Sequence, residues 1–225
     1  MKTKTYRIIL LFIASFFFSG IASAQKDAKA EEEIKDRAKQ KVGLLCEYIS
    51  TIADKVSDTR ENRLHFSYKA LSLFIGKGNS YQENGRTKKG VVMAVTSVTR
   101  KNPDGTPYVN RPLMKNYLIG LANLDKRYSK VVIQHTDIAD FKVSDLYPDP
   151  SGSNMLTCTV DIEQYFEGYN GDGQLLYYDK TVKRIKCYVI QEEVDDDLKS
   201  GGKKYEYLVL LGDVESLETT KELKR

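Results

Sequence analysis

Two histidines, the side chains best suited to acid–base catalysis near neutral pH, stand at positions 65 and 135 of the chain. His135 lies close in sequence to Asp137 and Asp140, and general-base catalysis uses an imidazole that is oriented by a carboxylate. His65 follows Leu64 on the flank of a helical pattern. Because sequence neighbours are their only support, a surface or structural role is the favoured interpretation for both histidines.

Three cysteines, Cys46, Cys158 and Cys187, are the candidate nucleophiles and disulfide partners. A reactive cysteine needs a base or a helix N-terminus that lowers its pKa, whereas Cys46 falls in mid-helix as a packed thiol. A hairpin turn at residues 172–173 would place Cys158 directly opposite Cys187. A turn at residues 170–171 would set the two about four residues out of step. A Cys158–Cys187 disulfide and a pair of neighbouring buried thiols therefore both remain open.

Other charged clusters have ordinary explanations. The acidic run from Glu192 to Asp197 could attract calcium, but it lacks spaced ligands and is expected to be a solvated hairpin tip. Lys183, Arg184 and Lys186 are likewise expected to be solvated rather than to bind phosphate.

The sequence has no zinc-ligand spacing, glycine-rich phosphate loop, Gly-x-Ser-x-Gly elbow or metalloprotease helix motif. We therefore expect no metal and no cofactor.

The aromatic set is biased, with fifteen tyrosines and no tryptophan. Five aromatic side chains gather around one predicted hairpin: Tyr165, Phe166, Tyr169, Tyr177 and Tyr178. They could form a platform for a peptide, a glycan or a protein partner. Packing on an ordinary sheet surface is the favoured alternative, because tyrosine suits pleated surfaces and keeps its hydroxyl in water.

The first 24 residues have the pattern of a secretory signal peptide. Lys2, Lys4 and Arg7 precede an apolar stretch, and the small residues 22–24 offer a cleavage site after Ala24. The apolar stretch is short for a membrane anchor, so no stable membrane span is expected after cleavage. Gln25 stands where a lipoprotein would need cysteine. These features predict an exported protein, periplasmic or extracellular.

The charge balance gives no case for a nucleic-acid partner. The 225 residues include 35 basic and 31 acidic side chains, and three of the basic ones lie in the leader. Loss of the leader would leave 32 against 31, too even a balance for an electrostatic nucleic-acid surface. The remaining 200 or so residues suit a single domain.

Apolar residues spaced by three and four predict helices in the first half of the chain. One helix is expected over residues 28–56, with an apolar stripe from Ile34 to Val56. Asp58 and Glu61 suggest a capping box for a second helix, whose inward stripe would be Leu64, Tyr68, Leu71 and Ile75. A short third helix is expected from Pro112, with Leu113, Tyr117, Leu121 and Leu124 on one side.

The second half alternates with the period of β-strands. Strands are expected at residues 90–99, 131–143, 156–163, 175–190 and 205–211, with a bend at Gly212. Turn signals at residues 102–105 and 169–173 separate some of them, and antiparallel pairing is expected throughout. The chain therefore divides into a signal peptide (1–24), one α+β domain (25–217) and a charged tail (218–225).

This order of helices and strands, closed by the strand Tyr207 to Val214, resembles the nuclear-transport-factor-2-like (NTF2-like) and cystatin-like superfamily. It is also similar to the exported NTF2-like proteins of unknown function from Gram-negative bacteria. The resemblance covers residues 32–217 and implies a helix pair and a short third helix packed in a curved antiparallel sheet, forming a cone. Enzymes of that superfamily place Asp, Tyr or His in the cone to move protons.

Three hypotheses about function follow. The first is an exported, non-enzymatic binding or accessory domain for a small ligand, a glycan or a protein. The second is an NTF2-like enzyme that uses the cone pocket for Tyr/Asp acid–base chemistry, for which Tyr68, Tyr117 and Asp137 are the candidate catalytic residues. The third is a structural component of an envelope assembly, and a homodimer is compatible with the sequence.

Overall fold

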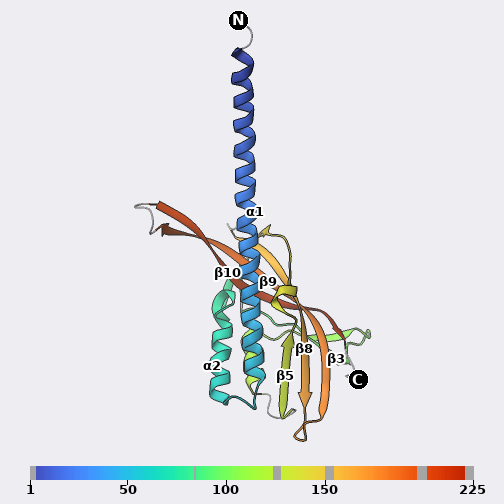
Figure 1. Ribbon diagram of the computed structural model, residues 1–225. Helices are drawn as coiled ribbons and strands as arrows, with labels where there is room; N and C mark the ends of the chain where they lie inside the picture. The colour runs from blue at the N-terminus through green and yellow to red at the C-terminus, as the bar shows by residue number, and fades with distance from the viewer. Residues whose placement is uncertain (1–3, 84, 124–127, 150–154, 197–201, 221–225) are drawn as a thin grey trace. The chain divides into compact units, whose positions relative to one another are not determined.

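The computed structural model describes residues 4–83, 85–123, 128–149, 155–196 and 202–220 (Figure 1). By its internal contacts the chain divides into two units, residues 1–36 and residues 37–225. The first unit is helical, and the side chains of residues 1–27, which include the expected cleavage site after Ala24, lie outside the described ones. The second unit is an α+β domain with antiparallel sheets, as the sequence predicts.

The predicted first helix is the C-terminal part of α1, Lys4–Ala53. Its apolar residues recur at helical spacing, and those within the second unit are buried: Ala38, Val42, Leu45, Ile49 and Ile52. The prediction that the stripe extends to Val56 is wrong, because that side chain is 70% exposed. The helix ends earlier since the Asp54 carboxylate accepts hydrogen bonds from the backbone N–H groups of Val56 and Ser57.

The second helix, α2 (Arg60–Leu71), is capped by Thr59, whose hydroxyl accepts a hydrogen bond from the Asn62 N–H. The predicted inward stripe is right for Leu71, which is buried, and wrong for the rest, because Leu64 is half-buried and Ile75 lies beyond the helix. Tyr68 is 62% exposed, and the buried residues are Arg63, Ser67, Ala70 and Leu71. Polar groups determine this face: the Arg63 guanidinium donates to the carbonyls of Asp58 and Ala122, and the Ser67 hydroxyl donates to the Arg63 carbonyl.

The third helix, α3 (Met114–Ala122), begins two residues after Pro112. It buries Met114, Leu118, Leu121 and Ala122, while Tyr117 lies half-buried on a neighbouring face. Arg63 binds the carbonyl of Ala122 at the C-terminus of this helix, where a positive charge also favours the helix dipole. This bond joins α2 to α3 and so orients the face that carries Tyr117.

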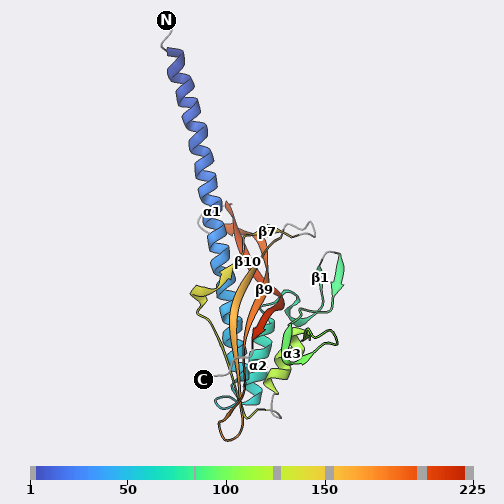
Figure 2. The same cartoon turned by 90° about the vertical axis from the view of Figure 1, so that its right-hand side faces the viewer.

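The main sheet has the strand order β10-β9-β8-β5, with every pairing antiparallel. Its long strands are β8 (Leu156–Tyr169), β9 (Leu175–Asp196) and β10 (Gly202–Thr220), and β5 is Lys130–His135. The short strands β6 (Lys142–Val143) and β7 (Tyr147–Pro148) continue the β5 side of β8. The C-terminal part of α1 lies beside the main sheet (Figures 1 and 2). Two of its side chains reach strand backbones: Arg37 donates to the Tyr207 carbonyl of β10 and Ser50 to the Ile133 carbonyl of β5.

The β8–β9 hairpin takes the first of the two registers that the sequence left open. Cys158 pairs with Cys187, although the turn itself spans Asn170–Gly173 and a register shift lies between Gly168 and Tyr169. Gly173 has the positive φ of 76° that favours glycine. Both cysteines are buried and no disulfide joins them, and Cys46 is buried as well. Burial raises the pKa of the Cys46 thiol to about 12, so the predicted packed thiol fits its surroundings.

β9 and β10 extend further than the sequence suggests. β9 continues through Asp196, so the predicted acidic turn from Glu192 is wrong up to that residue, and residues 197–201 lie outside the described ones. The predicted bend at Gly212 is confirmed by a register shift between Leu211 and Val214. At its other end β10 runs to Thr220, beyond the expected domain boundary at 217, and residues 221–225 lie outside the described part.

Two small hairpins flank the main sheet. The first joins β1 (Tyr81–Glu83) to β2 (Arg86–Lys88), and the second joins β3 (Val95–Lys101) to β4 (Pro107–Asn110) through the predicted turn at residues 102–105. Just before β3, Ala94 N–H donates to the carbonyl of Val214 at 2.7 Å, which fixes this hairpin to β10. The chain between β5 and β6 forms a short 3-10 helix, η2 (Ile138–Asp140), where the sequence predicts one strand over residues 131–143. None of the described helices is long and apolar enough to cross a membrane.

Candidate functional site

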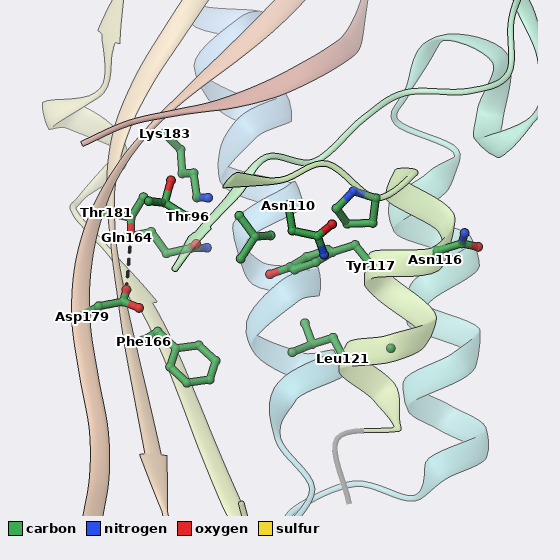
Figure 3. Close-up of a pocket in the computed structure, with 13 residues that line it drawn as sticks. Thr96, Asn110, Asn116, Tyr117, Leu121, Gln164, Phe166, Asp179, Thr181 and Lys183 are labelled. Carbon is green, nitrogen blue, oxygen red and sulfur yellow. Dashed lines mark hydrogen bonds between the residues drawn. The ribbon is translucent and has the colours of Figure 1, made fainter. Parts of the chain in front are cut away.

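A cavity of about 420 Å³ lies within the second unit, between α3, the β3–β4 hairpin and the inner faces of β8 and β9 (Figure 3). Apolar side chains from several elements line it, among them Val95, Pro112, Leu121 and Phe166. Polar side chains converge on the same space: Thr96, Asn110, Tyr117, Gln164, Asp179, Thr181 and Lys183. A largely apolar pocket with a few convergent polar groups is the usual form of a small-molecule site.

A second hollow of about 370 Å³ adjoins the first and shares five of its lining residues: Val95, Thr96, Asn110, Phe166 and Asp179. Aromatic rings and one exposed arginine dominate its remaining wall. The Arg100 guanidinium lies 4.0 Å from the centre of the Tyr108 ring, a cation–π contact. The Phe166 ring packs edge-on against Tyr128 and Tyr177, with centroids 5.9 and 5.7 Å away.

Strand alternation explains why polar groups of β9 enter the cavity. Asp179, Thr181 and Lys183 occupy alternate positions on one face of β9, the face that Ile185 and Cys187 bury further along. The Thr181 hydroxyl lies within hydrogen-bond distance of the Asp179 carboxylate, at 3.3 Å, and of the Thr219 hydroxyl, at 3.0 Å. The second of these contacts links the cavity wall on β9 to Thr219 of β10.

Burial displaces the pKa values of three groups in this cavity. Burial raises the pKa of the half-buried Asp179 carboxyl, although hydrogen bonds from Tyr177 and Thr181 act against it. Burial lowers the pKa of Lys183 to about 8, although Asp179 and Glu215 act in the opposite direction. The pKa of Tyr117 is raised, first by burial and then by the charge of Asp179, so its hydroxyl stays protonated at neutral pH.

Of the three candidate catalytic residues from the sequence, Tyr117 lines the cavity. Tyr68 lies on the exposed face of α2, and Asp137 is exposed at the start of η2, where its carboxylate accepts the Ala139 N–H at 3.1 Å. No histidine is among the described residues that line the cavity. The His135 ring is in hydrogen-bond contact with the Thr136 carbonyl and packs edge-on against Phe141, which is consistent with a structural role.

The five aromatic residues of the predicted platform divide between the two faces of the hairpin. Phe166 and Tyr177 face the second hollow, as described above. Tyr165 and Tyr178 stack at 6.5 Å on the other face, where Tyr165 also donates to Glu163 and Tyr169 donates to Glu167. Because neighbouring residues on a strand point to opposite faces, these five side chains do not form one surface.

The sequence patterns do not indicate four of the cavity residues: Lys183, Asp179, Thr181 and Gln164. The expectation that Lys183 is solvated like Arg184 and Lys186 is wrong, because Lys183 is only 5% exposed. One signal was available: Lys183 has the same strand parity as Ile185 and Cys187, two residues that the alternation already places inside. A charged residue at an inward position is itself an indication of a site.

Gly120 of α3 tests whether the cavity is open. A Cβ atom added there would have no neighbour within 4 Å, although the residue lines the cavity. We expect Gly120→Ala to raise the free energy of unfolding by about 0.5 to 1 kcal/mol, because alanine favours the helix and nothing obstructs its methyl group. Urea unfolding would measure this gain. A loss of stability would mean that this space is filled.

The described residues contain no group of three or more His, Cys, Asp or Glu side chains that could hold a metal ion. The arrangement can bind and orient an amphipathic molecule through an apolar wall, several amides and hydroxyls, and one cation.

In comparisons with known proteins, no family model, curated protein or solved structure matches this chain.

Proposed function

We propose that this protein is exported and that its α+β domain, of the NTF2-like type, binds a small amphipathic molecule without catalysing its conversion. The observation that carries the proposal is the cavity of about 420 Å³, in which apolar side chains surround a few converging polar ones. The signal-like residues 1–24 support export to the periplasm or beyond. The order of the helices and the antiparallel sheet supports the NTF2-like type.

The experiment is a ligand screen by thermal shift, together with native mass spectrometry of freshly purified protein to detect a co-purified molecule. The control pair is Gly120→Ala, which leaves room in the cavity, and Gly120→Phe, whose ring would occupy it. A ligand of this site should bind to wild type and Gly120→Ala and lose its affinity for Gly120→Phe. Equal binding to all three proteins would place the ligand elsewhere and refute the assignment.

An enzymatic function is the second candidate, and the displaced pKa values of Asp179 and Lys183 favour it. Perturbed acids and bases are common at catalytic sites, and Tyr117 supplies a protonated hydroxyl beside them. Turnover of a bound ligand by the purified protein, abolished in Asp179→Asn, would replace the binding function by this one. A ligand that binds and is recovered unchanged supports the binding function.

Export makes a prediction about Cys158 and Cys187. The two residues are directly opposite in the register, and an oxidising compartment favours a disulfide between such neighbours. We expect protein secreted to the periplasm of a bacterial host to be lighter by two hydrogen atoms and to have one free thiol after denaturation. Cytosolic protein should have three. A Cys158→Ser variant is the control, and three free thiols in the secreted protein would contradict the prediction.

A further inference from the structure

Lys183 is a buried lysine that faces the cavity. Its side chain extends from the inner face of β9 toward the space in front of Asn110 (Figure 3), and the residue is 5% exposed. Its ammonium group donates one hydrogen bond, to the carbonyl of Ala94 at 2.6 Å. An ammonium group has three N–H donors, and no described residue accepts from the other two.

The positive charge of Lys183 also lacks a counter-charge in direct contact. No carboxylate among the described residues forms an ion pair with it. Asp179 on the same strand and Glu215 on β10 act on it only through their fields, and Glu215 is itself paired with Arg111 at 2.7 Å. The group that α3 contributes nearby is the neutral Tyr117. Buried charges in proteins are normally paired, so the missing anion is a property of this site.

We propose that the cavity binds a small organic monoanion whose carboxylate pairs with Lys183 and whose apolar or aromatic body lies against Phe166 and Leu121. This inference rests on the binding function proposed above and names its ligand class. A carboxylate fills the two unused donors of the ammonium group and supplies the missing charge. A dianion such as a phosphate fits less well, because Lys183 is the one cation among the described lining residues and Asp179 would repel the second charge.

The test compares carboxylic acids with their amides, which have nearly the same shape and no charge. Benzoate, phenylacetate and 2-naphthoate, each beside its amide, would be titrated into the protein by calorimetry at neutral pH. We expect at least one acid to bind about tenfold or more tightly than its amide, since a charge-assisted hydrogen bond is worth about 1.5 to 3 kcal/mol. This comparison uses the wild-type protein and needs no variant to fold.

Two variants then assign the effect to Lys183. Lys183→Met keeps the length of the side chain and removes its charge, so it should weaken acid binding about tenfold or more and leave amide binding unchanged. Lys180→Met is the matched control, because Lys180 lies on the opposite face of β9 and pairs with Glu163 at 2.9 Å. Lys180→Met should bind acid and amide as the wild type does.

The pH dependence gives an independent readout. Lys183 carries its charge below its pKa of about 8, so acid binding should be strong at neutral pH and fall as the pH rises above 8. Bound carboxylate stabilises the ammonium form and shifts the fall to somewhat higher pH. Asp179 on β9 and Glu215 on β10 are the acids whose fields reach Lys183, and burial raises the pKa of Tyr117 on α3. An amide has no charge for the ammonium group to pair with, so amide binding should not change.

The outcomes separate the two proposals. Acid and amide affinities that are equal in every pair, or that fall equally in Lys183→Met, would overturn the anion proposal while leaving a neutral-ligand function in place. The anion proposal is also overturned if no acid binds. The binding function itself fails if, in addition, no compound of the wider screen distinguishes Gly120→Ala from Gly120→Phe.

Discussion

Replacing Glu83 with glutamine is expected to lower the free energy of unfolding by about 2 to 3 kcal/mol at neutral pH, because it disrupts a partly buried charge cluster. The Glu83 side chain is 11% exposed and accepts hydrogen bonds from the Lys186 ammonium at 2.9 Å and from the Tyr188 hydroxyl. Lys88 adds a third contact at 3.3 Å. These bonds hold the β1–β2 hairpin against β9, so their loss should destabilise both.

The same cluster predicts how stability depends on pH. Burial alone would raise the pKa of Glu83, but the hydrogen bonds from Lys186 and Tyr188 outweigh it and lower the pKa from 4.5 to about 2. The carboxylate therefore stabilises the folded protein fully above pH 4.5, its ordinary pKa, and this contribution is lost as the pH falls toward 2. The difference between wild type and Glu83→Gln should shrink over that range.

Urea unfolding at neutral pH and at several acidic pH values would measure both effects. The control is Glu163→Gln, which removes a carboxylate with 40% side-chain exposure that pairs with Lys180 at 2.9 Å. An exposed pair is worth about 0 to 1 kcal/mol, so this variant should remain close to wild type. Equal losses in the two variants would show that Glu83 behaves as an ordinary surface carboxylate.

Truncating Leu118 to alanine should cost about 3 kcal/mol of unfolding free energy. Leu118 is completely buried on α3, and removal of a core leucine loses transfer free energy and leaves a cavity. Lys115→Ala is the matched control on an exposed position of the same helix and should change stability by less than about 0.5 kcal/mol. Thermal and urea unfolding would report the difference, and a cost below about 1 kcal/mol would contradict close packing of α3 on the domain.

Leu118→Ala also bears on the cavity, because Tyr117 and Leu121 line it from the same helix. The substitution leaves both of these side chains in the sequence and removes only the group that anchors the helix beneath them. If α3 loosens, ligand affinity should fall together with stability. A variant that loses stability while its ligand affinity stays at the wild-type level would show that the helix keeps its place.

Local patterns predicted much of this fold correctly. Helical spacing located the buried stripe of α1, and strand alternation identified β8 and β9 with their inward faces. Each of these features is determined by residues that are close in the sequence or that lie on one hairpin. Sequence patterns alone are therefore enough to predict them. The sequence left two registers open for the β8–β9 hairpin, and the structure has the one in which Cys158 pairs with Cys187.

The inward face of α2 and the site depend on distant partners. The spacing of apolar residues pointed to Tyr68, whereas Arg63 turns inward because its acceptor is the carbonyl of Ala122, 59 residues away. The acceptor of Lys183, the carbonyl of Ala94, is 89 residues away. The spacing of apolar residues contains no information about hydrogen bonds between distant polar groups. It therefore predicted a solvated Lys183, whereas the structure has a buried one.

By itself, then, the sequence determined an α+β chain with antiparallel strands, a signal-like start and the parity of each side chain on its strand. Only the tertiary structure decided which polar residues share a cavity, because α3, the β3–β4 hairpin and β9 meet there from separate parts of the chain. The packing of these elements against one another determines which side chains are buried and which hydrogen-bond partners they have. It makes Lys183 a buried cation without an ion-pair partner among the described residues.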